Sequence, residues 1–301
     1  MSIARQDDPQ ALDPCSLRAE RRGESMLGTA FETPRLLLVE QPGPWGAAGL
    51  RESRFDPRVA EALEDAAKHE DVRVQVVRSP GRHRTNDSRT WMFADCRDGQ
   101  AGLRWGSFAA DADLLDLPLD GSAGTPDPDP LYLVCVHGSR DRCCAERGRS
   151  VAAALAALRP GRVWESSHLG GHRFAANVLA LPAGLLYGRV LASDAALFVD
   201  ATEADEVLAR SVRGQVGVPA VAQAALAFGY EQLALRERAA LRFVSTSDAS
   251  DGQATVRLRG PRGLLDVSVQ VDEVTTDGTS CGDPGPSRYS TYRPLNLVPV
   301  G

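Results

Sequence analysis

The chain has 301 residues, of which 43% are hydrophobic and 25% charged, and its formal net charge is −6 at pH 7. This composition predicts a globular protein with a large core, and the length favours two domains with an appendage. Because no long basic run could neutralise phosphates, we expect no nucleic-acid partner. The N-terminus has no apolar leader and no window reaches the length of a membrane span, so we expect a cytoplasmic protein without membrane contact.

The first half of the chain predicts the order strand, helix, strand, strand. Residues 1–30 are polar and are interpreted as a flexible arm. Asp56 and Pro57 form an N-cap and first-turn pair, which predicts a helix that runs to Lys68. Short apolar or alternating runs indicate the strands 35–40, 72–77 and 89–96.

A linker rich in Pro, Asp and Gly covers residues 120–130 and is the predicted domain boundary. The pattern then restarts with a buried strand over 131–135 and a segment of helical composition from Gly148. Thr202 and Asp205 resemble a capping box that opens a further helix. The remaining predicted elements are a strand over 163–167, a hairpin over 174–190, a helix over 219–241 and a hairpin around GPRG, followed by a turn-rich tail.

The two halves match each other as patterns. RLLLVEQPGPWG and PLYLVCVHGSRD both show a strand followed by a loop that contains Pro or Gly. We therefore predict an α/β protein with two thioredoxin-like units, over 31–125 and 126–241, and a β-hairpin tail over 242–301. The alternative is that all α/β units share such patterns. In our interpretation the first unit is degenerate, and only the second kept metal chemistry.

Half of the six cysteines lie in CVHGSRDRCC, residues 135–144. Six cysteines are too few for a disulfide scaffold, and without a secretion signal the thiols should stay reduced. Their clustering therefore suggests metal or redox chemistry. We interpret the separate Cys15, Cys96 and Cys281 as ordinary thiols.

A second group of ligand-type residues lies in SHLGGHRF, where His168 and His172 are four residues apart. The two intervening glycines disfavour a helix and permit a tight loop with close backbone approach to a bulky ligand. These histidines, Cys135 and either Cys143 or Cys144 would supply four ligands suited to zinc or to iron and sulfur.

CVHGSRDRCC and HLGGH together resemble the sucrase/ferredoxin-like family, whose pattern is CxH with xxRDxxC, followed by HxGGH. The resemblance implies a thioredoxin-like ferredoxin with a [2Fe-2S] cluster bound by two cysteines and two histidines. Residue by residue, it implies the ligands Cys135, Cys144, His168 and His172. Cys143 departs from the pattern, because its adjacent thiol could compete for the second cysteine position. No pair of carboxylates is singled out for a sucrase activity.

This resemblance implies a one-electron carrier within a redox system, with a reductase or an electron acceptor as its partner. Two imidazoles in place of thiolates raise the reduction potential, and we hypothesise that reduction is coupled to protonation of His168 or His172. The alternatives are a redox- or iron-responsive sensor and a zinc-stabilised structural domain. His137 lies in a CxH segment like that of Rieske centres, but the sequence has no second CxxH segment of that kind. We therefore expect a structural or supporting role for His137.

Three arginines crowd the two motifs. Arg140 and Arg142 lie within the cysteine segment, and Arg173 follows His172. They are either solvated surface residues or residues that offset cluster charge and dock a redox partner.

Overall fold

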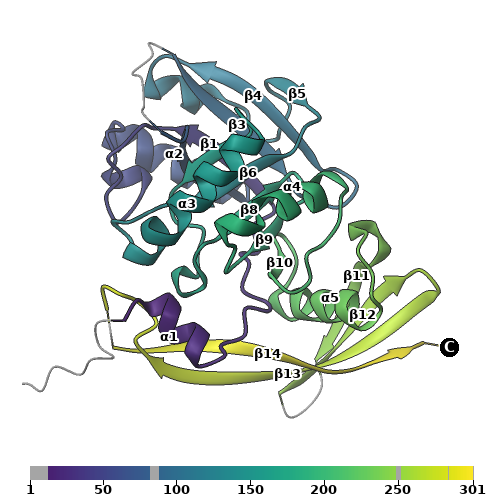
Figure 1. Ribbon diagram of the computed structural model, residues 1–301. Helices are drawn as coiled ribbons and strands as arrows, with labels where there is room; N and C mark the ends of the chain where they lie inside the picture. The colour runs from purple at the N-terminus through teal and green to yellow at the C-terminus, as the bar shows by residue number, and fades with distance from the viewer. Residues whose placement is uncertain (1–12, 82–87, 249–251, 284, 301) are drawn as a thin grey trace, which may run out of the picture.

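The computed structural model describes residues 13–81, 88–248, 252–283 and 285–300. Within these ranges the chain forms a mixed α/β fold, with one ten-stranded sheet that carries helices and a separate four-stranded antiparallel sheet (Figure 1). The predicted α/β class is therefore confirmed. Among the described residues no helix combines the length and apolarity needed to cross a membrane.

The N-terminal half of the large sheet has the strand order β2-β1-β3-β4-β5. β1 pairs in parallel with β2 and antiparallel with β3, as expected when a helix connects the first pair. The Asp56 carboxylate caps the helix by accepting the backbone N–H of Arg58 at 2.8 Å. The predicted strands and helix are confirmed, whereas β4 was missed and β5 lies inside the predicted linker. The elements are β1 (Arg35–Glu40), α2 (Pro57–His69), β2 (Val72–Arg78), β3 (Arg89–Asp95), β4 (Gly102–Phe108) and β5 (Thr125–Asp127).

The C-terminal half repeats this arrangement with the order β7-β6-β8-β9-β10. Each pair has the same relative direction as its counterpart: parallel for β6 with β7, and antiparallel for the following pairs. The two halves thus have the concordant strand orders that the predicted duplication requires. The elements are β6 (Leu131–Cys135), α3 (Arg142–Leu158), β7 (Val163–Ser166), β8 (Val178–Leu181), β9 (Leu185–Tyr187), α4 (Ala195–Glu203) and β10 (Val212–Gln215).

One helix prediction in this half was confirmed but began too late, and another was wrong. α3 begins at Arg142 rather than at Gly148, because the Asp141 carboxylate caps it by accepting the Cys143 N–H at 2.9 Å. The paired cysteines therefore lie in the first turn of a helix and not in a loop. Thr202 does not open a helix either, since α4 ends one residue later and the Thr202 hydroxyl donates to the carbonyl of Phe198 at 2.8 Å.

The two halves share one inner core. Alternate residues of β6 separate to opposite faces: Leu131, Leu133 and Cys135 join one apolar cluster, and the residues between them join another. Trp105 of β4 and Trp164 of β7 also meet in the first cluster, with ring centroids 6.0 Å apart. Four strand spacings of about 4.8 Å separate these strands along the sheet, so the sheet folds back on itself. Cys135 thus stands at the end of a buried strand, on the inner face.

The C-terminal segment departs from the predicted hairpin appendage. Residues 260–263 do form a hairpin turn, but the strands belong to a four-stranded antiparallel sheet, and the later part of the expected turn-rich tail belongs to its last strand. The predicted helix over 219–241 ends at Gln232. The elements are α5 (Ala220–Gln232), β11 (Arg242–Asp248), β12 (Gln253–Gly260), β13 (Gly263–Asp277) and β14 (Pro286–Pro299).

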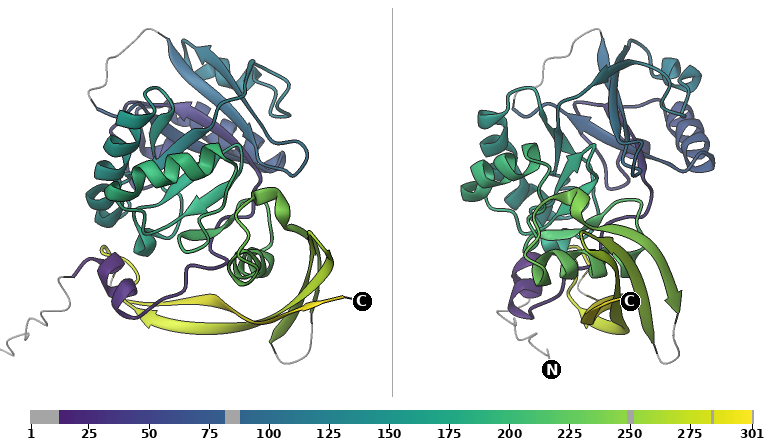
Figure 2. Two further views of the ribbon diagram at one scale, coloured as in Figure 1. Left: turned by 45° about the vertical axis from the view of Figure 1, so that its right-hand side comes forward. Right: turned by 90° about the vertical axis from the view of Figure 1, so that its right-hand side faces the viewer.

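The N-terminal segment is folded from Asp13 on, whereas residues 1–12 of the predicted arm lie outside the described residues. Helix α1 (Cys15–Arg21) buries Cys15 completely. Figure 2 shows α1 beside the turn that connects the two long strands β13 and β14. The N-terminal helix and the turn between β13 and β14 therefore lie at the same end of the molecule as the cysteine-bearing start of α3.

Candidate metal centre

Three of the four predicted ligands converge where β6 and β7 end. Cys135 is the last residue of β6, Cys144 lies in the first turn of α3, and His168 follows β7. The two thiol sulfurs and one ring nitrogen of His168 all lie within 4.8 Å of one another. His168 Nδ1 is 3.9 Å from Cys144 Sγ. Both cysteines are fully buried, so this group could hold a metal ion.

The fourth predicted ligand, His172, lies beside this group. Its ring stacks on that of His168, with centroids 5.4 Å apart. His172 Nε2 is 3.0 Å from the carbonyl oxygen of Thr279, which can only accept, so Nε2 carries the hydrogen and Nδ1 keeps its lone pair. Nδ1 is buried and has no hydrogen-bond partner among the described residues. A buried, unpartnered lone pair of this kind fits a metal ligand.

The two buried thiols of the centre share their protons unequally. A hydrogen bond from Cys144 lowers the pKa of Cys135 well below its usual value. The resulting Cys135 thiolate in turn raises the pKa of Cys144. The pair therefore loses its first proton at Cys135, which provides the thiolate form that metals bind.

Cys143 lies in a different group from Cys144. Its sulfur is 3.5 Å from Cys15 Sγ and 3.4 Å from Cys281 Sγ. Together with a carboxylate oxygen of Asp141, these sulfurs form a second group within 4.8 Å that could hold a metal. Cys15 and Cys281, which we interpreted as ordinary thiols apart from the motifs, are both brought to the start of α3 by folding. Cys96 is buried elsewhere, in the inner core.

A family model described as sucrase/ferredoxin-like matches residues 26–214, more than half of the chain. The chain belongs to the sucrase/ferredoxin-like family. The resemblance seen in the two motifs is thereby confirmed. No curated protein and no solved structure matched the chain. The sucrase/ferredoxin-like region contains both motifs but excludes α1, α5 and the four-stranded sheet.

Within the sucrase/ferredoxin-like region, His137 supports the centre through both ring nitrogens. Its Nε2 donates to the carbonyl oxygen of Gly46 at 2.7 Å, and its Nδ1 accepts the backbone N–H of His168 at 3.1 Å. Burial lowers the pKa of His137, which keeps the ring neutral and able to accept. With both nitrogens occupied, His137 positions His168 and does not act as a ligand.

Two arginines that the sequence analysis missed hold the HLGGH loop of this sucrase/ferredoxin-like protein. Arg213 is 1% exposed and donates to the carbonyl of Gly170 at 2.9 Å and to Asn177 Oδ1 at 2.8 Å. Arg73 donates to the carbonyl of His168 at 3.0 Å. Burial lowers the pKa of Arg213 to about 9 and also lowers the pKa of Arg73. In the described part of the chain neither guanidinium has a carboxylate within ion-pair distance.

The arginines expected beside the motifs have other surroundings. Arg140 is exposed, and Arg142, also exposed, lies against Cys281, which raises the pKa of Arg142. Arg173 pairs with Glu24 at 2.9 Å. The cations that face the centre are Arg213, which is buried, and Arg73, which is half-buried; they come from β10 and β2.

The two glycines of the loop adopt the left-handed conformation, as the expected tight curvature requires. Gly170 has φ of +83° and Gly171 has φ of +62°. The close approach at Gly171, however, is to the Arg213 guanidinium, which a Cβ would strike, whereas a Cβ at Gly170 meets open space. Close packing against Arg213 therefore explains why residue 171 is a glycine, and approach to a bulky ligand is not needed as the reason.

We predict that Gly171→Ala destabilises the protein more than its matched control Gly170→Ala. The control should cost about 1 kcal/mol for the left-handed backbone alone. Gly171→Ala should cost roughly 2 kcal/mol more, because Arg213 must give up hydrogen bonds worth about 1 kcal/mol or more each. Urea denaturation measures both values, and equal costs would show that Arg213 does not restrain this loop.

Proposed function

We propose that this protein is a ferredoxin-like electron carrier with a [2Fe-2S] cluster bound by Cys135, Cys144, His168 and His172 in a thioredoxin-like unit. The observation that carries the proposal is the buried group of two thiols and His168 with the unpartnered His172 Nδ1 beside it. Membership of the sucrase/ferredoxin-like family supports the same ligand set. The repeated strand order supports the duplicated thioredoxin-like fold.

When bound, the cluster would supply a centre that accepts one electron. Arg213 and Arg73 would then stabilise the negative charge that arrives on reduction, because neither is neutralised by a carboxylate in the described ranges. Cys144 lies in the first turn of α3, so the positive end of that helix adds to the effect. A zinc ion with the same ligands never changes its charge. These two cations therefore favour the redox function over a zinc-stabilised structural domain.

Proton coupling, if it accompanies reduction, should involve His168 rather than His172. The Nε2–H of His172 donates to the Thr279 carbonyl, and loss of that proton would leave two lone pairs facing each other. His168 directs Nδ1 towards Cys144 and is half-buried, so its Nε2 can exchange a proton with solvent. We propose that His168 Nε2 takes up the proton when the protein is reduced.

This assignment predicts a reduction potential that depends on pH. Where the oxidised protein has lost the His168 proton and the reduced protein keeps it, the potential should fall by about 59 mV per pH unit. A potential that stays flat from about pH 6 to 10 would refute the coupling. His168→Cys should abolish the slope, and the matched variant His172→Cys should retain it. Voltammetry of the purified proteins provides the measurement.

The proposed function is tested on purified protein. We expect visible absorption and an electron paramagnetic resonance signal that develops on reduction. Colourless, zinc-loaded protein would instead support the structural alternative and contradict electron transfer. Rapid, reversible electron exchange with a reductase is expected of a carrier, whereas slow exchange without turnover would favour a sensor.

A further inference from the structure

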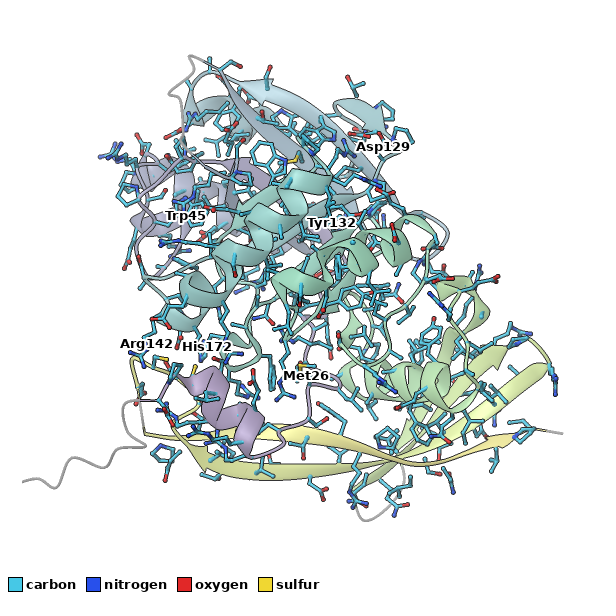
Figure 3. The ribbon with its side chains drawn as sticks, in the orientation of Figure 1. Met26, Trp45, Asp129, Tyr132, Arg142 and His172 are labelled. Atoms are coloured by element: carbon cyan, nitrogen blue, oxygen red, sulfur yellow. The ribbon has the colours of Figure 1, made fainter. Side chains whose placement is uncertain are left out.

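The three thiols of Cys15, Cys143 and Cys281 and the Asp141 carboxylate form a compact group, called here the three-thiol group. Cys15 and Cys143 are fully buried and Asp141 is nearly so, and Cys281 is half-buried. Asp141 Oδ1 is 3.6 Å from Cys15 Sγ. In Figure 3, the labels of Arg142 and His172 mark this region at the start of α3, directly beside α1.

The spacing of the sulfurs fits a shared metal ion better than a disulfide. Zinc bonds of about 2.3 Å to tetrahedral thiolates place the sulfurs about 3.8 Å apart. The sulfur of Cys143 lies at comparable distances, 3.5 Å and 3.4 Å, from the other two sulfurs. A disulfide would join only two of them and would leave a third thiol beside a buried carboxylate. A metal ion would engage all four groups.

The surroundings of the group orient these ligands and offset their negative charge. Asp141 Oδ2 accepts the N–H of Cys281 at 2.8 Å and the hydroxyl of Ser280 at 3.1 Å. Among the described backbone donors, Asp141 Oδ1 accepts the N–H of Cys143 alone, which leaves it a lone pair on the side of Cys15. The N–H of Cys15 donates to Cys281 Sγ at 3.2 Å. Outer donors of this kind are typical of built metal sites.

We propose that the three-thiol group binds a structural Zn²⁺ ion through Cys15, Cys143, Cys281 and Asp141, with release of the thiol protons. Thiolate-rich tetrahedral sets suit Zn²⁺, and binding requires the deprotonated thiols. Cys15 and Cys281 both lie outside the sucrase/ferredoxin-like region. The ion therefore ties α1 and the turn between β13 and β14 to the start of α3.

The position of this ion links it to the candidate cluster. Thr279, whose carbonyl accepts the Nε2–H of His172, lies two residues before Cys281. His172 Nε2 is also 3.9 Å from Asp141 Oδ2. Zinc would add a restraint on this turn, but the Thr279 carbonyl already sets the tautomer of the His172 ring, so iron binding does not require the zinc ion.

Metal analysis of the purified full chain tests the proposal. Wild-type protein should contain about one zinc ion per chain in a closed structural site. Cys15→Ala and Cys281→Ala should lose that zinc and keep their iron. Cys144→Ala should show the reverse pattern, and the matched control Cys96→Ala, which removes a buried thiol outside both groups, should keep both metals.

Zinc-free wild-type protein that still contains iron would overturn the proposal, as would zinc content unchanged in both Cys15→Ala and Cys281→Ala. A disulfide from Cys143 to either cysteine, detected by mass spectrometry of alkylated protein, would also overturn it. If the variants fail to fold, Co²⁺ titration of metal-free Cys144→Ala protein decides. Thiolate-to-cobalt absorption that disappears when Zn²⁺ replaces Co²⁺ would support the zinc site. Absence of that absorption would oppose the proposal. Zinc and iron are measured separately. Protein that lacks iron would contradict the proposed function, and its zinc content would still test the three-thiol group.

Discussion

Cys144→Ala is expected to abolish iron binding and visible absorption, whereas Cys143→Ala should retain both. The two cysteines are neighbours in the first turn of α3, but their side chains enter different groups. Cys144 lies with Cys135 and His168, while Cys143 contacts Cys15 and Cys281. Removal of one thiolate ligand should cost most of the bound iron, measured by iron content and by paramagnetic resonance after reduction.

The neighbouring variant is the control for this prediction, because it removes the same chemical group from the same helical turn. Equal loss of iron in both variants would mean that the start of α3 is merely destabilised. Loss of iron in Cys143→Ala alone would assign the ligand role to Cys143 and contradict the proposed centre.

Arg213→Met is expected to destabilise the protein by about 3 kcal/mol or more, because it leaves several buried acceptors without donors. These acceptors are the carbonyls of Gly170 and Thr29 and the side-chain oxygen of Asn177. The variant should also lower the reduction potential, because the negative charge of the reduced state loses a buried cation. Urea denaturation and voltammetry measure the two effects.

A second substitution separates the charge of Arg213 from its hydrogen bonds. Arg213→Lys keeps a cation but cannot reproduce the planar fork of the guanidinium. It should therefore lose stability while its potential stays closer to that of the wild type. Arg140→Met, which removes an exposed arginine near the motif, should change neither quantity much. A potential that is unaffected by Arg213→Met would show that this cation does not tune the centre.

Much of the large sheet could be predicted because its signals are local. The apolar runs of β1 and β6 and the Asp56–Pro57 start of α2 each specify an element within a few residues. Where prediction failed, the deciding interaction was either a single side-chain hydrogen bond or a pairing with a segment remote in the sequence. The true start of α3 depends on the side chain of Asp141, and β14 becomes a strand only by pairing with β13.

The candidate centre was predictable to the same extent. Its motif residues lie in two short segments whose preceding strands, β6 and β7, are parallel neighbours, so their ends meet. Arg213 and Arg73 carry no motif and reach the loop from other strands of the sheet. Likewise, nothing near Cys15 or Cys281 in the sequence indicates that both approach Cys143.

The long pairing of β13 with β14 has a consequence for the tolerance of this chain to insertions and deletions. Their register runs without a break in pairing from Leu265↔Pro299 to Asp277↔Pro286, with one bulge. Each residue adds about 3.4 Å to an antiparallel strand. The length of the β13–β14 hairpin therefore sets how far Thr279 and Cys281 extend towards α3. Deleting one residue from each strand would withdraw Thr279 and Cys281 by about 3.4 Å, enough to break their hydrogen bonds. We therefore expect this protein to tolerate substitutions in β13 and β14 better than insertions or deletions that change the length of the hairpin.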